Sequence, residues 1–309
     1  MKLNGLIAAT YTPFAPDGAV NLDLIPAMIE HMIERGVSGF YVCGSTGEGE
    51  SLTIEERKAV AEVSISAADR RLPVVVQVGH NSLSTACELA RHASECGADA
   101  ISSLPPTYFK PTSLDILIEC LAEIAASAPD LPYYYYHIPR LSGVRFDMPT
   151  LLEKVDPLIT NFAGIKFSDF FLAEMGACQA VSGGKFDILF GSDEMILGAL
   201  AMGATGAVGS CYGFAAPLWN QIIDAHHDGD AERANALMRK AISLVRLLDR
   251  RPGPFHAAVR QVIWPLLGFD LGPVRLPQSQ LSEVNCQEVR QQLEQSGFSE
   301  AIKLGKFVA

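Results

Sequence analysis

Short hydrophobic runs alternate with longer amphipathic segments along the first three quarters of the chain. The short runs are rich in β-branched and aromatic residues and predict strands at residues 5–14, 39–43, 73–78, 98–104, 132–138, 162–168, 186–190 and 206–210. The longer segments carry apolar residues at helical spacing and predict helices over 22–35, from Thr53, from 81 or 82 to 97, and over 112–127, 148–155, 171–181, 193–202 and 216–227.

Eight strands, each followed by a helix, predict an α/β fold of the (β/α)₈ type, a TIM barrel. Local signals support the helix ends: Gly36 is placed as a C-cap, and Thr53 with Glu56 forms a capping box. A doubly wound open sheet also alternates strands and helices. Eight regular units without a Gly-rich dinucleotide turn favour the closed barrel.

The rhythm changes after Gly229, where three helices are predicted without strands between them, at 230–249, 255–267 and 283–296. No Gly/Ser-rich linker separates them from the preceding units, so we expect an appendage that packs on the barrel. The expected division is a catalytic (β/α)₈ barrel at 1–228 and a C-terminal helical extension at 229–309.

Composition limits the function classes. The 309 residues are 49% hydrophobic and 19% charged, and a formal net charge of −11 argues against a nucleic-acid partner. No run of eighteen uncharged apolar residues predicts a membrane span, and the N-terminus lacks the apolar core of a signal peptide. Seven cysteines without a CxxC pair are typical of a reduced protein, so we expect the cytoplasm.

A single lysine interrupts the buried strand FAGIKFS. Burial of Lys166 among Phe162, Ile165 and Phe167 would lower its pKa toward the neutral, nucleophilic amine. The alternative is that its stem packs and its ammonium group reaches water at the strand end.

Other polar side chains stand at the C-terminal ends of the predicted strands, which share one cleft in a barrel. They are Thr10, Thr12, Ser45, Thr46, Tyr136, Ser168, Ser192, Asp193, Glu194 and Ser210. An amine that attacks a ketone gives an iminium, which serves as an electron sink for carbon–carbon bond cleavage, and a phenol can move the required proton. This set suits a Schiff-base enzyme acting on a hydroxylated keto acid.

Two segments near this cleft have alternative interpretations. The loop GSTGEGES (44–51) reads either as an anion nest for a carboxylate or phosphate or as a plain Gly-rich turn, and with a lysine nearby we favour carboxylate capture. Glu48, Glu50, Glu55 and Glu56 are expected to be solvated. Of the four tyrosines 133–136, only Tyr136 is expected to face the cleft, with His137 outward and structural. No HxxxH or HxH pair predicts a metal site.

Four motifs in register resemble one known family. GSTGEGESLT, YHIP followed by LSGV, GIKFS and GSDE resemble the family of N-acetylneuraminate lyases and dihydrodipicolinate synthases, and within it the lyases, from about Leu3 to beyond Pro265. The resemblance implies that Lys166 forms the Schiff base and that Tyr136 handles the proton. It also implies that Ser45 and Thr46 grip the keto-acid carboxylate, with Thr46 linked to Tyr136.

The resemblance also implies roles for residues outside this core. Tyr108 corresponds to a tyrosine that reaches into a neighbouring subunit's site, which implies an oligomer, usually a tetramer. The sugar hydroxyls and N-acetyl end are expected to contact Gly191, Asp193, Glu194 and Ser210, while Ser168 stands where these lyases often carry threonine.

Two adjacent positions bear on the substrate. The synthases usually carry an arginine five residues after the proton-handling tyrosine, and Leu141 at this place resembles the lyases. Arg140 stands where the lyases tend to have a small residue. If it turns into the cleft it would select a more acidic sugar or aldehyde; if it turns to solvent, nothing changes.

The activity that the resemblance implies is that of a class I aldolase that reversibly cleaves N-acetylneuraminate to N-acetylmannosamine and pyruvate. The substrate would be bound covalently through the lysine, with no metal or organic cofactor. An alternative keeps the chemistry but uses another 2-keto acid, as a different pyruvate-dependent aldolase, synthase or dehydratase. A barrel that only binds a sugar acid would be expected to lack the lysine or the tyrosine, and both are present.

Overall fold

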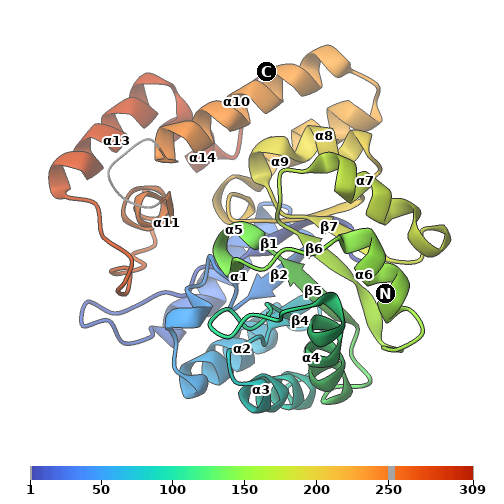
Figure 1. Ribbon diagram of the computed structural model, residues 1–309. Helices are drawn as coiled ribbons and strands as arrows, with labels where there is room; N and C mark the ends of the chain where they lie inside the picture. Colours follow the sequence, from blue (N-terminus) through green and yellow to red (C-terminus); the bar gives the residue numbers. More distant parts are fainter. Residues whose placement is uncertain (1, 250–254, 309) are drawn as a thin grey trace.

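A closed barrel of eight parallel strands forms the centre of the chain (Figure 1). The computed structural model describes residues 2–249 and 255–308. Each strand pairs with the next, and the last pairs with the first, in the order β1 (Gly5–Ala9), β2 (Gly39–Val42), β3 (Val74–Gln77), β4 (Ala100–Ser103), β5 (Tyr133–His137), β6 (Phe162–Phe167), β7 (Asp187–Phe190) and β8 (Gly206–Gly209). The predicted barrel is confirmed, although β1 ends before Thr10 and Thr12.

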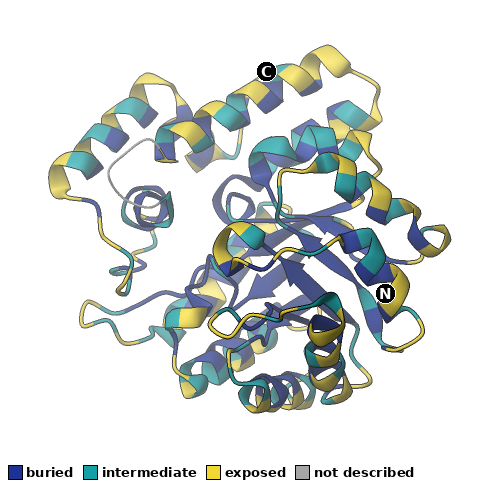
Figure 2. Ribbon diagram, in the orientation of Figure 1, coloured by how far each residue is buried: buried dark blue, intermediate teal, exposed yellow. Residues whose placement is uncertain are grey.

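Side chains alternate along each strand between the barrel interior and the layer under the helices, as the period of two requires. Figure 2 shows the strands as almost wholly buried. On β5, Tyr133 and Tyr135 join the large core shared with the helices, whereas Tyr134 and Tyr136 join the smaller interior cluster. The expectation that only Tyr136 faces inward is therefore wrong for Tyr134, whose hydroxyl donates to Asp187 Oδ2 at 3.0 Å.

Helices surround the barrel between successive strands, as α1 (Ile25–Glu34), α2 (Ile54–Ala68), α3 (Leu83–Glu95), α4 (Leu114–Ala126), α6 (Met148–Val155), α7 (Leu172–Ala180), α8 (Ile196–Ala201) and α9 (Tyr212–His227). The capping box of α2 is present, with Thr53 Oγ1 accepting from the Glu56 N–H. Some starts differ from prediction: Leu22–Leu24 and Asp193–Met195 are 3₁₀ turns, and α9 begins at Tyr212 rather than at 216, with a kink at Ala215. A short helix, α5 (Pro139–Ser142), follows β5 directly.

The C-terminal segment is helical, as predicted, and lies against the barrel on one side (Figure 1). It contains α10 (Ala231–Asp249), a run made of α11 (Phe255–Ala258), a π-helical turn (Val259–Ile263) and α12 (Trp264–Leu266), then α13 (Glu283–Gln295) and α14 (Phe298–Leu304). The sequence did not predict α14, a short helix set off from α13 by Gly297 in a left-handed conformation. None of the helices in the described ranges is long and apolar enough to cross a membrane.

Candidate active site

Lys166 lies inside the barrel, on β6 and in register with Tyr136 on β5. Only 3% of the residue is exposed. Its Nζ is 3.6 Å from the ring centroid of Tyr41 and 3.8 Å from that of Tyr136. Burial lowers the pKa of Lys166 well below its ordinary value, and the charge of Asp193 only partly opposes this. The amine is therefore stabilised in its neutral form, which is the nucleophilic one.

The phenol of Tyr136 lies beside two serine hydroxyls. Its oxygen is 3.4 Å from Ser45 Oγ. Burial raises the pKa of Tyr136, while Ser45, Ser168 and the charge of Arg140 act to lower it. The phenol thus keeps its proton at neutral pH and has a hydroxyl at hand through which a proton can pass. Ser168 Oγ is buried and makes no hydrogen bond of regular geometry among the described residues, although it lies close enough to the phenol to act on its pKa.

Thr46 does not make the contact with Tyr136 that the family resemblance implies. Its Oγ1 is 2.7 Å from Ser210 Oγ at the end of β8, and Ser45 meets the phenol instead. Consecutive residues of a turn point in different directions, so one hydroxyl lies toward β5 and the other toward β8. Ser45, Thr46, Tyr136 and Ser210 are nonetheless brought together at one end of the barrel.

The loop that carries Ser45 and Thr46, residues 44–51, has an unusual backbone, as does Cys43 directly before it. Cys43 and Glu48 adopt left-handed conformations with φ of 58° and 54°, which residues with side chains rarely occupy. Glycine is needed at Gly49, because a Cβ there would lie 1.9 Å from the carbonyl oxygen of Cys43. The loop therefore passes tightly over the end of β2.

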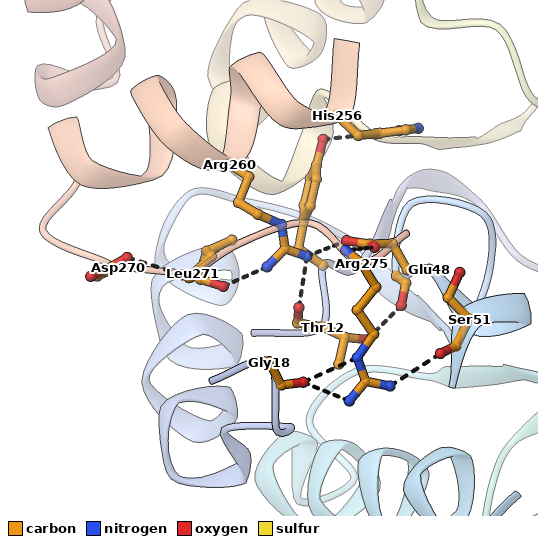
Figure 3. A network of polar contacts seen from close by, with 12 residues as sticks. Thr12, Gly18, Glu48, Ser51, His256, Arg260, Asp270, Leu271 and Arg275 are labelled. Carbon is orange, nitrogen blue, oxygen red and sulfur yellow. Dashed lines mark hydrogen bonds and ion pairs between the residues drawn. The ribbon is translucent and has the colours of Figure 1, made fainter. Parts of the chain in front are cut away.

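Glu48 is buried, so the expectation that it is a solvated charge is wrong. Its carboxylate pairs with Arg260, at 2.7 Å from Nη2, and the two side chains are 1% and 0% exposed. Figure 3 shows this pair with Arg275 among polar contacts between the loop and the C-terminal segment. Glu56 is also paired, with Arg275 at 2.6 Å. Sequence reasoning missed these contacts because the arginines lie more than two hundred residues away.

The segment after β7 packs closely around Asp193. Its Oδ2 accepts the Cys211 N–H at 2.8 Å, and its carbonyl oxygen accepts from Trp219 Nε1 at 2.8 Å. Burial raises the pKa of Asp193 to about 6. Gly191 must be glycine, because a Cβ would lie 1.9 Å from Ser168 Oγ. Asp193 is thus held by the chain's own donors and sits within electrostatic reach of Lys166.

Glu194 lies at the edge of this region. It lines a cavity of about 700 Å³ together with Leu172, Met195 and Met238, between α8 and the start of α10. Neither Lys166 nor Tyr136 lines this cavity. The cavity is therefore separate from the site inside the barrel.

Three predicted site residues are exposed. Arg140 and Leu141 lie on α5, with Leu141 62% exposed. The positive charge of Arg140 still acts to lower the pKa of Tyr136 and of His256. Tyr108 is 78% exposed and makes an edge-to-face contact with Phe109. No hydrogen bond or ring contact joins Tyr108 to Lys166 or Tyr136 within the described ranges.

Sequence reasoning missed two further residues, Tyr41 at the site and His256 on α11. Tyr41 faces inward on β2, its ring packs edge-to-face on Tyr136 at 5.6 Å between centroids, and its hydroxyl donates to Ser102 Oγ at 3.0 Å. Strand parity could have found it, because Phe40 and Val42 face the helices. His256 on α11 lies 3.2 Å from the Tyr11 hydroxyl through Nδ1. No local pattern marks His256, because its neighbours come from the other end of the chain.

Among the residues that the structure describes, two groups of side chains have the composition of metal ligands. Glu62 lies on α2, His92 on α3 and Cys96 directly after α3. His137, Asp169 and Glu174 form the second group, but the guanidinium of Arg145 already pairs with both carboxylates. His137 itself is buried and packs its ring against Phe167. Within the described ranges no hydrogen bond, ion pair or ring contact joins either group to Lys166.

Fold and site together define a (β/α)₈-barrel protein with a buried amine, whose pKa burial lowers, beside a phenol at the centre of the barrel. The chain matches the Dihydrodipicolinate synthetase family over residues 2–296. N-acetylneuraminate lyase A of Xenopus laevis is 41% identical over 279 residues, which are 89% of this chain and 90% of the relative.

Solved structures agree with this match. N-acetylneuraminate lyase of Proteus mirabilis superposes with a TM-score of 0.92 at 39% identity, covering 96% of this chain and 100% of that chain. The N-acetylneuraminate lyase (sialic acid aldolase) of Aliivibrio salmonicida gives 0.92 at 41% identity, covering 96% and 98%. The chain belongs to the dihydrodipicolinate synthetase family.

Proposed function

We propose that the protein is a class I aldolase, a carbon–carbon lyase that reversibly cleaves N-acetylneuraminate to N-acetylmannosamine and pyruvate. The observation that carries the proposal is the position of Lys166 Nζ, buried and 3.8 Å from the ring of Tyr136. A lysine whose cation is disfavoured by burial is a nucleophile toward a ketone. The relatives named above as N-acetylneuraminate lyases support this substrate.

The amine of Lys166 attacks the C2 ketone of the ring-opened substrate, and loss of water gives an iminium. The C3–C4 bond then breaks: its electron pair moves toward the iminium nitrogen, and the C4 hydroxyl loses its proton and becomes the aldehyde. Tyr136, with Ser45 at 3.4 Å, handles that proton. The resulting enamine is protonated at carbon, and water releases pyruvate from the lysine. The electrons balance without a metal or organic cofactor.

Different hydroxyls around the amine bind different parts of the substrate. Ser45 and Thr46 grip the carboxylate next to the ketone. Ser210, already 2.7 Å from Thr46, meets the sugar chain, together with Ser168 and the segment formed by Gly191, Asp193 and Glu194. Asp193 accepts a hydrogen bond from the backbone N–H of Cys211. It therefore fixes the conformation of this segment and can also accept a hydrogen bond from a sugar hydroxyl.

The acceptor aldehyde depends on α5. Leu141 cannot hold a second carboxylate, which argues against the synthase reaction. Arg140 is exposed, yet its charge acts on the pKa of Tyr136, so it is the residue of α5 through which an acceptor with an added negative charge would be recognised. The alternative substrate is therefore a more anionic 2-keto acid. A panel of aldehydes, measured as kcat/KM with wild type and Arg140→Ala, separates the two: preference for the anionic aldehyde that disappears in the variant supports the alternative.

The working enzyme is a homotetramer in the cytoplasm, and Tyr108 reaches into the site of a neighbouring subunit. In support, the adjacent rings of Tyr108 and Phe109 are 78% and 85% exposed, an apolar pair typical of an interface. Light scattering gives the subunit number. Tyr108→Ser should lower both the subunit number and kcat, and an active monomeric variant would contradict this assembly.

Borohydride reduction tests the central step. Incubation with pyruvate and borohydride should convert the iminium to a stable secondary amine, and peptide mapping should place the adduct on Lys166. Reduction without pyruvate is the control. An adduct on another residue, or none at saturating pyruvate, contradicts the proposed function.

A further inference from the structure

We infer that Arg260 is a positioning residue for the reaction: through Glu48 it holds loop 44–51 in the conformation in which Ser45 and Thr46 grip the keto-acid carboxylate. The inference rests on the proposed function of this loop. It assigns to the C-terminal helices a part in substrate binding, although Arg260 itself touches neither of the two hydroxyls.

The loop needs external support at Glu48. The backbone there is left-handed, with φ 54° and ψ 32°, a conformation that residues with side chains adopt only when their surroundings hold it. Glu48 lies two positions after Thr46. A relaxation of Glu48 to an ordinary conformation would redirect the chain and move the hydroxyl of Thr46 away from Ser210.

The support comes from the C-terminal segment. One carboxylate oxygen of Glu48 accepts from Arg260 Nη2 at 2.7 Å, and the other accepts from the Arg275 N–H at 2.9 Å. Arg260 Nη2 also donates to the Thr12 carbonyl at 2.8 Å. The guanidinium thus ties the loop to the segment that follows β1 (Figure 3).

Two further contacts restrict the loop on either side of Glu48. Thr12 Oγ1 donates to the carbonyl of Gly47 at 2.7 Å. Arg275 Nη1 donates to the carbonyl of Ser51 at 3.1 Å. Glu48 is therefore the centre of a network that spans the second half of the loop. Charged hydrogen bonds buried from water, such as those of Arg260 with Glu48, fix geometry more strongly than exposed ones.

The test compares Arg260→Met in two backgrounds, in the condensation of pyruvate with N-acetylmannosamine. In the wild-type background the KM for pyruvate should rise at least tenfold, with a smaller change in kcat. In a Ser45→Ala/Thr46→Val background the carboxylate grip is already gone, so Arg260→Met should change the KM less than twofold. An equal rise in both backgrounds overturns the inference, because it would mean a general loss of structure.

Two companion variants keep the test decisive. Arg260→Lys retains the charge and one donor and should restore part of the affinity for pyruvate; if Arg260→Met does not fold, Arg260→Lys and Glu48→Gln take its place. Arg35→Met is the matched control. Arg35 ties α1 to α14 through the carbonyls of Ile302 and Lys303, so it removes another link between barrel and C-terminal segment without touching the loop. Its KM for pyruvate should equal that of wild type.

The outcome also separates this inference from the proposed function. If borohydride traps pyruvate on Lys166 in the wild type but Arg260→Met leaves the KM unchanged, only the inference fails. If the wild type traps no pyruvate at all, the proposed function fails first.

Discussion

Lys166 and Arg260 are both buried basic side chains, but their surroundings differ. Arg260 has a carboxylate partner, Glu48, and donates to backbone carbonyls as well. Lys166 lies between two tyrosine rings, and within the described ranges no carboxylate pairs with it. Burial lowers the pKa of both groups, but Glu48 acts to raise that of Arg260. The paired arginine holds structure in place, whereas burial without a carboxylate partner favours the neutral, nucleophilic form of the lysine.

Removing the amine of Lys166 tests whether this residue is the nucleophile and should have the largest effect on activity. Lys166→Met deletes the nucleophile, and loss of such a group costs about 10⁴-fold or more in kcat. The measurement is steady-state cleavage of N-acetylneuraminate by coupled detection of pyruvate. Lys166→Arg is the control, because it keeps a long basic side chain but no nucleophilic amine, and it should be equally inactive. Turnover by either variant within tenfold of wild type would show that the amine is not the catalyst.

Tyr136→Phe should have the next largest effect. It keeps the ring that covers the amine and removes only the hydroxyl, which should lower kcat by about 10²–10⁴-fold, the usual contribution of a general acid or base. Trapping of pyruvate by borohydride should remain, because the amine is intact. If trapping is lost together with turnover, the hydroxyl of Tyr136 is needed for the reactivity of the Lys166 amine and not only for proton transfer.

Unfolding experiments compare the two cations directly. Arg260→Met leaves the carboxylate of Glu48 buried without its partner and should lower the free energy of unfolding by about 3–5 kcal/mol. Lys166→Met replaces a desolvated amine by an apolar side chain of similar length, so the free energy of unfolding should stay equal or rise.

Urea denaturation of both variants beside wild type measures this difference. The double variant Glu48→Gln/Arg260→Met should be less destabilised than the sum of the single variants, because the buried charge loses its partner only in the singles. A destabilisation by Lys166→Met as large as that by Arg260→Met would abolish the distinction between the two sites.

The two cations also differ in what the sequence reveals. Lys166 could be singled out from local signals, because the strand around it is apolar and strand–helix alternation predicts a barrel that buries such a strand. Those signals alone left open a lysine whose ammonium group reaches water. The polar residues at the other strand ends, Tyr136 among them, and the family resemblance favoured the reactive amine.

Arg260 could not be identified in this way, because its partner Glu48 is 212 positions away and sits in a loop that reads as solvated. The same limit applies to the two hydroxyls of the loop: the family resemblance implies that Thr46 contacts Tyr136, whereas Ser45 makes that contact. The direction of a hydroxyl in a turn depends on the tertiary contacts that fix the turn. The inward position of Tyr41, by contrast, was within reach of strand parity.

The pH dependence of stability should show the smallest difference between the two sites. The pKa of Lys166 is depressed in the folded state, while the unfolded lysine titrates near 10.5. Between these values the unfolded chain binds the extra proton, so this lysine makes stability increase as pH rises, by at most about 1.4 kcal/mol per pH unit. Below the folded pKa both states carry the proton, and the full cost of burying the cation remains.

Urea titrations of wild type and Lys166→Met from neutral to alkaline pH isolate this contribution, because the other titrating groups are common to both proteins. The difference in unfolding free energy, variant minus wild type, should shrink as pH rises toward 10.5. The same titration of Arg260→Met should run parallel to wild type, since an arginine stays protonated throughout this range. A constant difference for Lys166→Met would mean that the amine is charged in the folded protein, and the contrast between the two cations would fail at its chemical basis.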